Sequence, residues 1–177
     1  MQTNWRIHVV DPRTGHRGIA FVTNAIAATT QALVARLTTS GMPMHVLREG
    51  RVERTGDELR VSLDPGAGSA PDAALALRFA PVPAMTGAWA ACFPTWRDFL
   101  AYCVPQDRAM SSQPLQRRIS RQEIDLGIRL DACTPLAGTV SSRAAATIAG
   151  ERAPLCFHVP RVAFSFSVEA HDPDGTV

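Results

Sequence analysis

Arginine and carboxylate side chains gather in one part of this sequence. Five of the 18 basic residues lie between positions 108 and 129: Arg108, Arg117, Arg118, Arg121 and Arg129. A guanidinium can grip a carboxylate through two parallel hydrogen bonds, so an inward-facing subset could hold an acidic ligand. Glu123 and Asp125 stand two residues apart, about 6.5–7 Å between Cβ atoms in a strand, which would suit an acid and a base. Arg118, Arg121 and Glu123 are therefore candidate ligand-binding residues.

A solvated strand face would give the same pattern. Apolar Ile124, Leu126 and Ile128 alternate with the charged positions, as they do in any strand that is half exposed. Ion pairs on such a face contribute little to stability. Both interpretations stay open at this stage: an anion-binding face inside a cavity, or a charged face in water.

Histidine and cysteine offer a second kind of chemistry. Cys156 and His158 are two residues apart, so they could supply two metal ligands or a thiolate with its base. No second Cys/His pair stands at metal-binding spacing, and lone cysteines and histidines usually pack in the core. We therefore expect no metal and no cofactor. His45 follows a Met-Pro-Met turn and is a fourth candidate for ligand binding.

The composition excludes several functions. All 18 basic residues are arginine, so no internal lysine is present to form a Schiff base. The net charge is only +2 and the arginines are interleaved with 16 acidic residues, which argues against nucleic-acid binding. The start lacks the pattern of a signal peptide, and prolines interrupt the longest apolar stretch, so we expect no membrane association. Four widely spaced cysteines predict reduced thiols in a cytoplasmic protein.

Hydrophobic periodicity predicts the elements that must position these residues. Two-residue alternation predicts hairpins, one around the turn at 11–15 and one around 55–57, and long strands over 117–131 and 155–168. Helical spacing predicts one helix beginning at Asn24 and another beginning at Thr95, where Asp98 would complete a capping box. The fold class expected is α+β: mainly antiparallel β, a bent barrel-like sheet with two short packed helices, in a single domain spanning 1–177.

Several short segments are similar to a known family. The segments 17–22 (RGIAFV), 35–37 (ARL) and 41–45 (GMPMH) resemble a strand, helix end and turn of an uncharacterised bacterial branch of the acetoacetate-decarboxylase-like superfamily. The segments 96–100 (WRDFL) and 121–124 (RQEI) resemble a later helix and strand of that branch. The resemblance implies a bent, barrel-like antiparallel fold around a small-molecule cavity, and a tendency to oligomerise.

Two departures from the family change what can be expected. The namesake decarboxylases react through a Schiff-base lysine, and this sequence has none, so that reaction is not expected here. The chain also begins close to the RGIAFV strand, without the segment that usually precedes it in the branch. We therefore expect a homo-oligomer in which a second subunit closes the barrel.

The functional expectation is a small-molecule-binding barrel for an anionic organic ligand, without Schiff-base chemistry. Whether it also catalyses a reaction is left open. The alternative is a non-catalytic oligomeric binding or structural protein whose cavity is filled by its own side chains. A cavity lined by Arg and Glu would favour the first, and one packed with Phe, Leu and Ile would favour the second.

Overall fold

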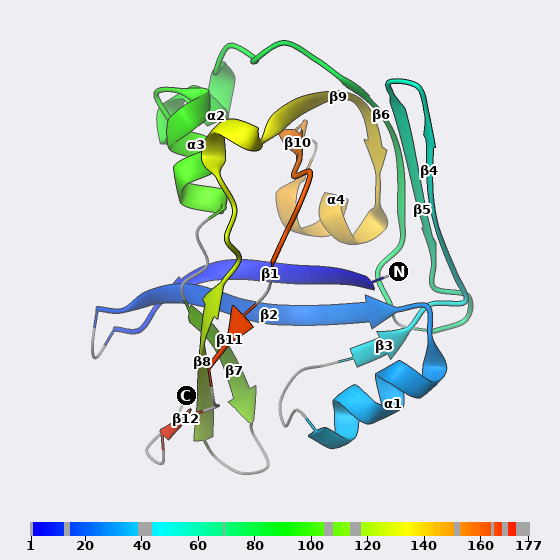
Figure 1. Cartoon of the computed structure of the whole chain (residues 1–177), viewed down its shortest axis with the longest axis vertical. Helices are drawn as coiled ribbons and strands as arrows, with labels where there is room; N and C mark the ends of the chain where they lie inside the picture. The colour runs from blue at the N-terminus through cyan, green and yellow to red at the C-terminus, as the bar shows by residue number, and fades with distance from the viewer. Residues whose placement is uncertain are drawn as a thin grey trace.

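Two β-sheets form the framework of the molecule (Figure 1). The computed structural model describes residues 2–12, 15–38, 44–68, 70–104, 108–113, 118–150, 153–163, 165–167 and 170–172. Within these ranges the fold is α+β and mainly β, as the alternating sequence pattern predicts, and the strands do not close into one barrel. No helix in the same ranges is long and apolar enough to cross a membrane.

The first sheet is mixed and contains seven strands of the described chain, in the order β1-β2-β7-β8-β11, with β3 beside β2 and β12 beside β8. Its strands are β1 (Gln2–Val10), β2 (Arg17–Ile26), β3 (Met44–Val46), β7 (Arg108–Gln113), β8 (Arg118–Asp125), β11 (Ser165–Phe166) and β12 (Ala170–Asp172). The predicted first hairpin is confirmed, because β1 and β2 pair antiparallel across the turn. Strand β2 also runs parallel to β3 and β7.

The second sheet is entirely antiparallel, in the order β10-β9-β6-β5-β4. Its strands are β4 (Glu49–Thr55), β5 (Glu58–Asp64), β6 (Ala73–Phe79), β9 (Thr134–Ser141) and β10 (Cys156–His158). The predicted hairpin around 55–57 is confirmed by the pairing of β4 with β5. Gly56 has a φ of +62°, a left-handed conformation that glycine adopts without steric cost in such a turn.

The described ranges contain four short α-helices rather than the two expected, together with a single 3₁₀ turn at Leu130–Ala132. They are α1 (Thr29–Thr38), α2 (Gly87–Cys92), α3 (Trp96–Cys103) and α4 (Arg143–Ala149). The predicted capping box of α3 is confirmed. The Thr95 hydroxyl accepts from the Asp98 N–H, and the Asp98 carboxylate accepts from the Thr95 N–H.

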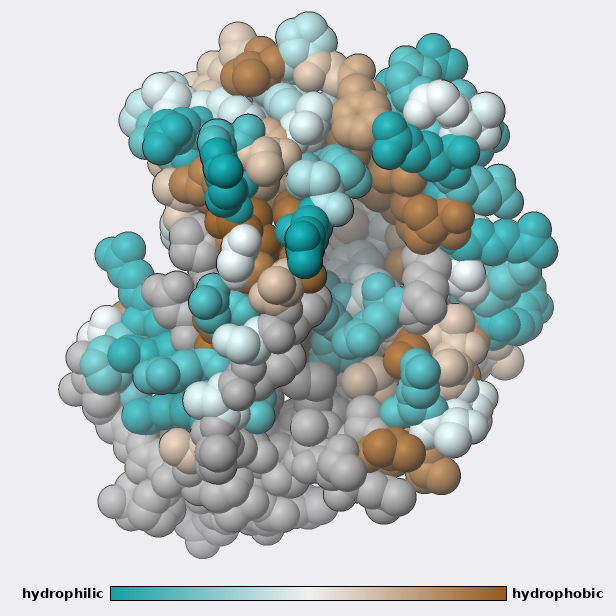
Figure 2. Space-filling model, viewed as in Figure 1, coloured by the Kyte–Doolittle hydropathy of each residue, from teal (hydrophilic) through white to brown (hydrophobic). Residues whose placement is uncertain are grey.

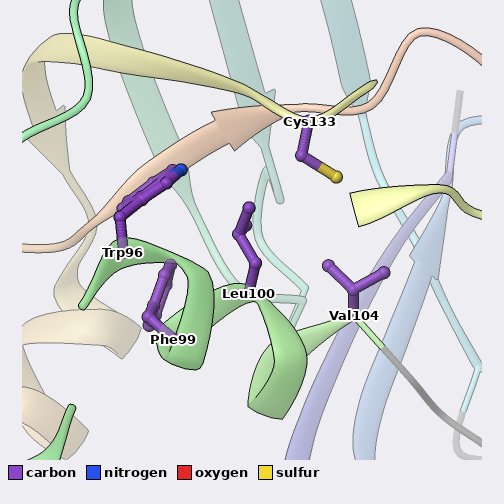
Figure 3. Packing of buried hydrophobic residues seen from close by; sticks show 5 residues of the cluster. All are labelled: Trp96, Phe99, Leu100, Val104 and Cys133. Atoms are coloured by element: carbon purple, nitrogen blue, oxygen red, sulfur yellow. The ribbon is translucent and has the colours of Figure 1, made fainter. Parts of the chain in front are cut away.

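The largest apolar cluster lies between α3 and the segment that precedes β9. Its buried members are Trp96, Phe99, Leu100, Val104 and Cys133. In Figure 3, Leu100 and Val104 project toward Cys133 from α3 and from the residue that follows it. A smaller cluster links the two sheets through Ala25, Leu47, Leu63 and Ala70. The spacing of apolar residues in α3 thus fixes where the helix packs.

The helix expected to begin at Asn24 begins five residues later, at Thr29. Asn24 lies inside β2, fully buried, paired with Asn4 on one side and with Met44 on the other. Because β1 pairs with one edge of β2 and β3 with the other, β2 continues through residues whose types would also suit the start of a helix. The tertiary structure therefore overrides a local capping signal.

The long strands expected at 117–131 and 155–168 are shorter in the structure. Strand β8 ends at Asp125, where Gly127 takes a φ of +54° and the chain leaves the sheet. The final stretch is divided between β10 in one sheet and β11 in the other. Its alternating residues thus pack against two different surfaces, and the sequence pattern alone does not reveal the change of sheet.

Candidate functional site

A pocket of about 390 Å³ lies between β1, β2 and β3 of the mixed sheet and the start of α4. Its other wall is the segment that leads into β6. The residues lining it are Trp5, Val22, Thr23, His45, Ala70, Pro71, Asp72, Arg143, Ala144 and Thr147. The volume is within the range of small-molecule sites. The space-filling view in Figure 2 is hollowed near its centre, with hydrophilic and hydrophobic surface around the opening.

Strand pairing places the side chains of Trp5, Thr23 and His45 on one wall of this pocket. Trp5 stands directly opposite Thr23 in the β1–β2 pair, and Ala25 stands opposite His45 in the β2–β3 pair. Thr23 and Ala25 are two residues apart in β2, so they share a face of the sheet. Ala25 is fully buried and packs against Leu47 of the chain leading to the second sheet. The face that carries these side chains therefore points into the molecule.

Two polar atoms on this wall are buried without a hydrogen-bond partner among the described residues. They are the indole Nε1 of Trp5 and the hydroxyl Oγ1 of Thr23. An indole N–H can only donate, and a hydroxyl can donate or accept. Leaving such a group unpaired in the interior costs about 1–3 kcal/mol. Both residues line the pocket, but the two atoms are inaccessible in this structure, so an acceptor in the pocket would reach them only if the Trp5 and Thr23 side chains rotated.

The opposite wall carries a carboxylate and a guanidinium. The Asp72 carboxylate accepts from the backbone N–H of Arg143 at 3.1 Å and from its Nε at 3.2 Å. Burial opposes ionisation of Asp72, but the hydrogen bonds and charge of Arg143 hold the pKa of this carboxyl below its usual value. The Arg143 side chain is 86% exposed, whereas that of Asp72 is 29% exposed. Asp72 thus anchors the first turn of α4, and the guanidinium lies at the rim.

The first turn of α4 is held by two further hydrogen bonds. The Ser142 hydroxyl accepts from the Ala145 N–H at 3.1 Å, which is an N-cap. The Thr147 hydroxyl donates to the Arg143 carbonyl at 2.9 Å. These contacts fix the position of Arg143 on the pocket rim, because they order the backbone on both sides of it.

The remaining lining is apolar and small. Val22, Ala70, Pro71 and Ala144 contribute carbon atoms to the pocket wall. Ala70 and Pro71 are buried, so this part of the wall is supported from behind. A pocket with a few polar groups and an otherwise apolar wall is typical of sites for small organic molecules.

Of the four residues predicted to bind a ligand, His45 lines this pocket and the other three belong to β8. The Arg121 guanidinium pairs with Asp11 at 3.0 Å, where the side chains are 28% and 8% exposed. Glu123 lies on the exposed surface, opposite Arg108 of β7. The side chain of Arg118 falls outside the described part of the chain. The carboxylate that Arg121 contacts is thus Asp11, which the sequence pattern did not indicate.

Cys156 and His158 lie together on β10, but their surroundings are apolar. Burial raises the pKa of the Cys156 thiol, and the His158 ring packs edge-on against Phe79 with centroids 5.5 Å apart. Across the residues that the structure describes, no group of three or more His, Cys, Asp or Glu side chains could hold a metal ion. All four cysteines are free thiols.

A second pocket, of about 640 Å³, lies between β9, α4 and the segment 153–155. Mostly small side chains line it, together with Trp89, Val140 and Leu155. The Trp89 indole N–H already donates to the Ala153 carbonyl at 3.0 Å. Among the described atoms that line this second pocket, none is buried without a hydrogen-bond partner. It therefore offers less to a polar ligand than the pocket beside Trp5.

Sequence reasoning missed Trp5, Thr23, Asp72 and Arg143. Trp5 lies in the predicted first hairpin, where its apolar ring fits the alternation, and the alternation carries no information about its N–H. The predicted hairpin brings Trp5 close to Val22 and Thr23, but the bulge that puts Thr23 opposite Trp5 leaves no signal in the alternation. Asp72 and Arg143 are 71 residues apart and carry no local motif. No protein-family model and no curated protein matches this chain, so the site is assigned from its geometry alone.

Proposed function

We propose that this chain is a small-molecule-binding protein that takes an organic anion in the pocket between Trp5 and Arg143. The observation that carries the proposal is that Trp5 and Thr23 line the same pocket and that each holds a buried donor, Nε1 and Oγ1, without a partner among the described residues. A protein that leaves two such groups unpaired loses stability unless a bound group satisfies them. A carboxylate offers two acceptor oxygens, one for each donor.

The electrostatics of the pocket support an anion rather than a cation. His45 and Arg143 are the lining residues that can carry positive charge, and Asp72 is engaged by the first turn of α4. A cationic ligand would meet an indole N–H and a guanidinium, neither of which can accept a hydrogen bond. An anion would meet donors from both walls.

Binding in this proposal is non-covalent. The sequence contains no lysine, so no internal amine is present to form an imine with a carbonyl ligand. None of the ten lining residues is a cysteine, and the pocket thus holds no thiol nucleophile. Charge, hydrogen bonds and apolar contact are the means of recognition in this proposal.

We also propose that the fold is a variant of the acetoacetate-decarboxylase-like architecture, with the two sheets as the walls of an incomplete barrel. Support comes from the position of the pocket, which is lined by β1, β2 and β3 of one sheet and by the segment entering β6 of the other. The resemblance of 17–22 to the family's strand is consistent with this, since 17–22 lies in β2.

The proposal is tested with simple acids and their uncharged counterparts. Butyrate and benzoate are titrated against the protein by calorimetry, with butyramide and benzamide as matched neutral probes. We expect the acids to bind and to raise the melting temperature, because a ligand at one hundred times its dissociation constant adds about 2.7 kcal/mol to the free energy of unfolding. We expect the amides to bind more weakly.

Two indole variants locate the site. Trp5→Phe keeps an aromatic ring and removes the N–H, and it should weaken binding of the acids about fivefold to tenfold, the value of one hydrogen bond. Trp89→Phe is the matched control, because its N–H is already used by Ala153 in the other pocket. Acids that do not bind, or that bind equally well to Trp5→Phe, contradict the proposal.

A further inference from the structure

Strand β4 is an open edge of the second sheet. It pairs with β5 on one side, and no described strand pairs with its other side. In Figure 1 it lies at the outer margin of the sheet, and all of its residues except Gly50 are exposed. An unpaired edge of this length is a surface to which another strand can add.

The turn of the β4–β5 hairpin determines which backbone groups face the open edge. In a two-residue hairpin the residues that flank the turn, here Thr55 and Glu58, form a hydrogen-bonded pair. Hydrogen-bonded and non-hydrogen-bonded pairs then alternate along the two strands. The N–H and C=O groups of Gly50, Val52 and Arg54 therefore point away from β5. An added strand would form its hydrogen bonds with these groups.

The order of charges along β4 is complementary to itself when the strand is reversed. The antiparallel register that pairs all seven residues of β4 with a second copy is centred on Val52. In that register Arg51 stands opposite Glu53 of the second copy, and Glu53 stands opposite its Arg51. The outward-pointing groups of Gly50 meet those of Arg54, and Val52 meets its own copy. Opposite charges directly across an antiparallel pair are stabilising.

Both charged residues can reach a second copy. The carboxylate of Glu53 has no hydrogen bond or ion pair with another described residue. Arg60 of β5 stands opposite Glu53, but it pairs with Glu58 at 2.6 Å. Arg51 pairs with Glu49 and remains 63% exposed, and a guanidinium has further donors for a second carboxylate.

A row of apolar side chains crosses the second sheet and ends at this open edge. Val52 stands opposite Val61, which stands opposite Leu75. Leu75 in turn stands opposite Val140. The inner members of the row are half-buried, whereas Val52 is 58% exposed. A second copy in the register described would place its own Val52 beside this one and continue the row.

The open edge of the first sheet does not share this property. Strand β1 pairs with β2 alone, and the antiparallel register that pairs all nine of its residues with a second copy is centred on Arg6. Two guanidinium groups would then meet at the two-fold axis. Like charges directly opposite each other are destabilising. The self-complementary edge is thus β4.

We propose that two copies of this chain form a dimer in which their β4 strands pair antiparallel about a two-fold axis at Val52. The two antiparallel sheets become one continuous sheet across the dimer. A strand of a different protein would fit equally well only if it carried the same order of charges, so the partner is a second copy. The proposal concerns a surface away from the pocket beside Trp5 and does not depend on the function proposed above.

Charge reversals in β4 test the pairing by sedimentation velocity over a range of micromolar concentrations. We expect the wild type to dimerise as its concentration rises. Arg51→Glu and Glu53→Arg each place like charges opposite each other at two positions, so each should weaken dimerisation about tenfold or more. Arg161→Glu is the control, because it reverses a charge at an exposed residue outside the strands, and it should dimerise as the wild type does.

An equal mixture of the two β4 variants is the stronger test. Position 51 of each variant then stands opposite an opposite charge at position 53 of the other. We expect the mixture to dimerise although each variant alone does so weakly. Recovery in the mixture also shows that both variants are folded.

A cysteine at the two-fold axis tests the register. Val52→Cys is made together with Cys92→Ser, which removes an exposed thiol. The two Cα atoms of a hydrogen-bonded antiparallel pair lie about 5.5 Å apart, a separation that a disulfide can span. We therefore expect a disulfide-linked dimer on mild oxidation. Thr55→Cys in the same background is the control, because Thr55 would lie opposite Glu49 and far from its own copy.

Three results would overturn the proposal. The first is a wild-type protein that stays monomeric at every concentration measured. The second is a dimer that both Arg51→Glu and Glu53→Arg leave unchanged, because such a dimer uses another surface. The third is a mixture of the two variants that stays monomeric, or cross-linking that is as fast at position 55 as at position 52, because either contradicts the antiparallel register centred on Val52.

Discussion

Replacing Thr23 by valine should stabilise the unliganded protein and weaken its binding of acids. The two side chains have nearly the same shape, so Thr23→Val leaves no large cavity and mainly exchanges a hydroxyl for a methyl group. In the unliganded protein the hydroxyl is buried without a partner among the described residues. A change that removes it therefore removes a penalty rather than a hydrogen bond.

The size of the effect follows from the cost of an unpaired buried group. That cost is about 1–3 kcal/mol, so the free energy of unfolding should rise by about this amount. For a chain of this size, about 1 kcal/mol corresponds to a rise of about 2–4 °C in melting temperature. With a carboxylate bound, the wild-type hydroxyl donates a hydrogen bond that valine cannot supply. The affinity for benzoate should therefore fall about threefold to tenfold.

Urea unfolding of the unliganded protein and calorimetric titration with benzoate measure the two effects. Thr139→Val is the matched control, because Thr139 lies exposed on β9, away from the pocket near Trp5. Its free energy of unfolding should change by less than about 0.5 kcal/mol and its affinity should not change. A Thr23→Val protein less stable than wild type would mean that the hydroxyl is paired without ligand, and the argument for the site would fail.

Three further predictions concern parts of the chain outside the pocket. Gly138→Ala should lower the free energy of unfolding by about 3 kcal/mol or more in thermal melts, because φ is +151° and a Cβ would meet a backbone oxygen of β6 at 2.0 Å. Gly150→Ala meets no atom but has a φ of +65° and a ψ of −145°, so it should cost about 1–3 kcal/mol from backbone strain alone, less than Gly138→Ala. Arg121→Ala should cost about 1–3 kcal/mol by removing the guanidinium from Asp11, and a change within 0.5 kcal/mol would indicate a solvated face instead. Burial raises the pKa of Cys103 to about 11, so this thiol should resist alkylation at pH 8 until the protein unfolds, as peptide mass mapping would record.

The parts of the fold that could be predicted from sequence are those determined by neighbours along the chain. The capping box joins Thr95 to Asp98, which is only three positions away. The β4–β5 hairpin is formed by a two-residue turn between strands that follow each other in the chain. Asn24 illustrates the opposite case. Its residue type suits a helix N-cap, but β1 and β3 pair with the strand that contains it, and these partners lie about 20 residues away on either side. Local signals do not report such pairing.

The sequence could have predicted the first wall of the pocket, apart from one irregularity in the pairing of β1 with β2. Counting outward from the turn of the first hairpin would place Trp5 opposite Val22. The register shifts between Trp5 and Arg6, so Trp5 stands opposite Thr23 instead. A shift of one residue in a strand exchanges the two faces of a sheet. The bulge therefore places Thr23, and not Val22, opposite Trp5 in the strand pair.

The second wall depends on a strand pair that the alternation of residues did not predict. In the β6–β9 pair, Ala74 stands opposite Ser141. Two antiparallel strands in this register bring the residues before β6 next to the residues after β9, and so Asp72 meets Arg143 where α4 begins. The pocket thus needs two conditions at once, the bulge in the first hairpin and the β6–β9 register. Because the proposed anion meets groups on both walls, variants of Thr23 and of Asp72 should affect its binding together, and their effects on affinity should not simply add.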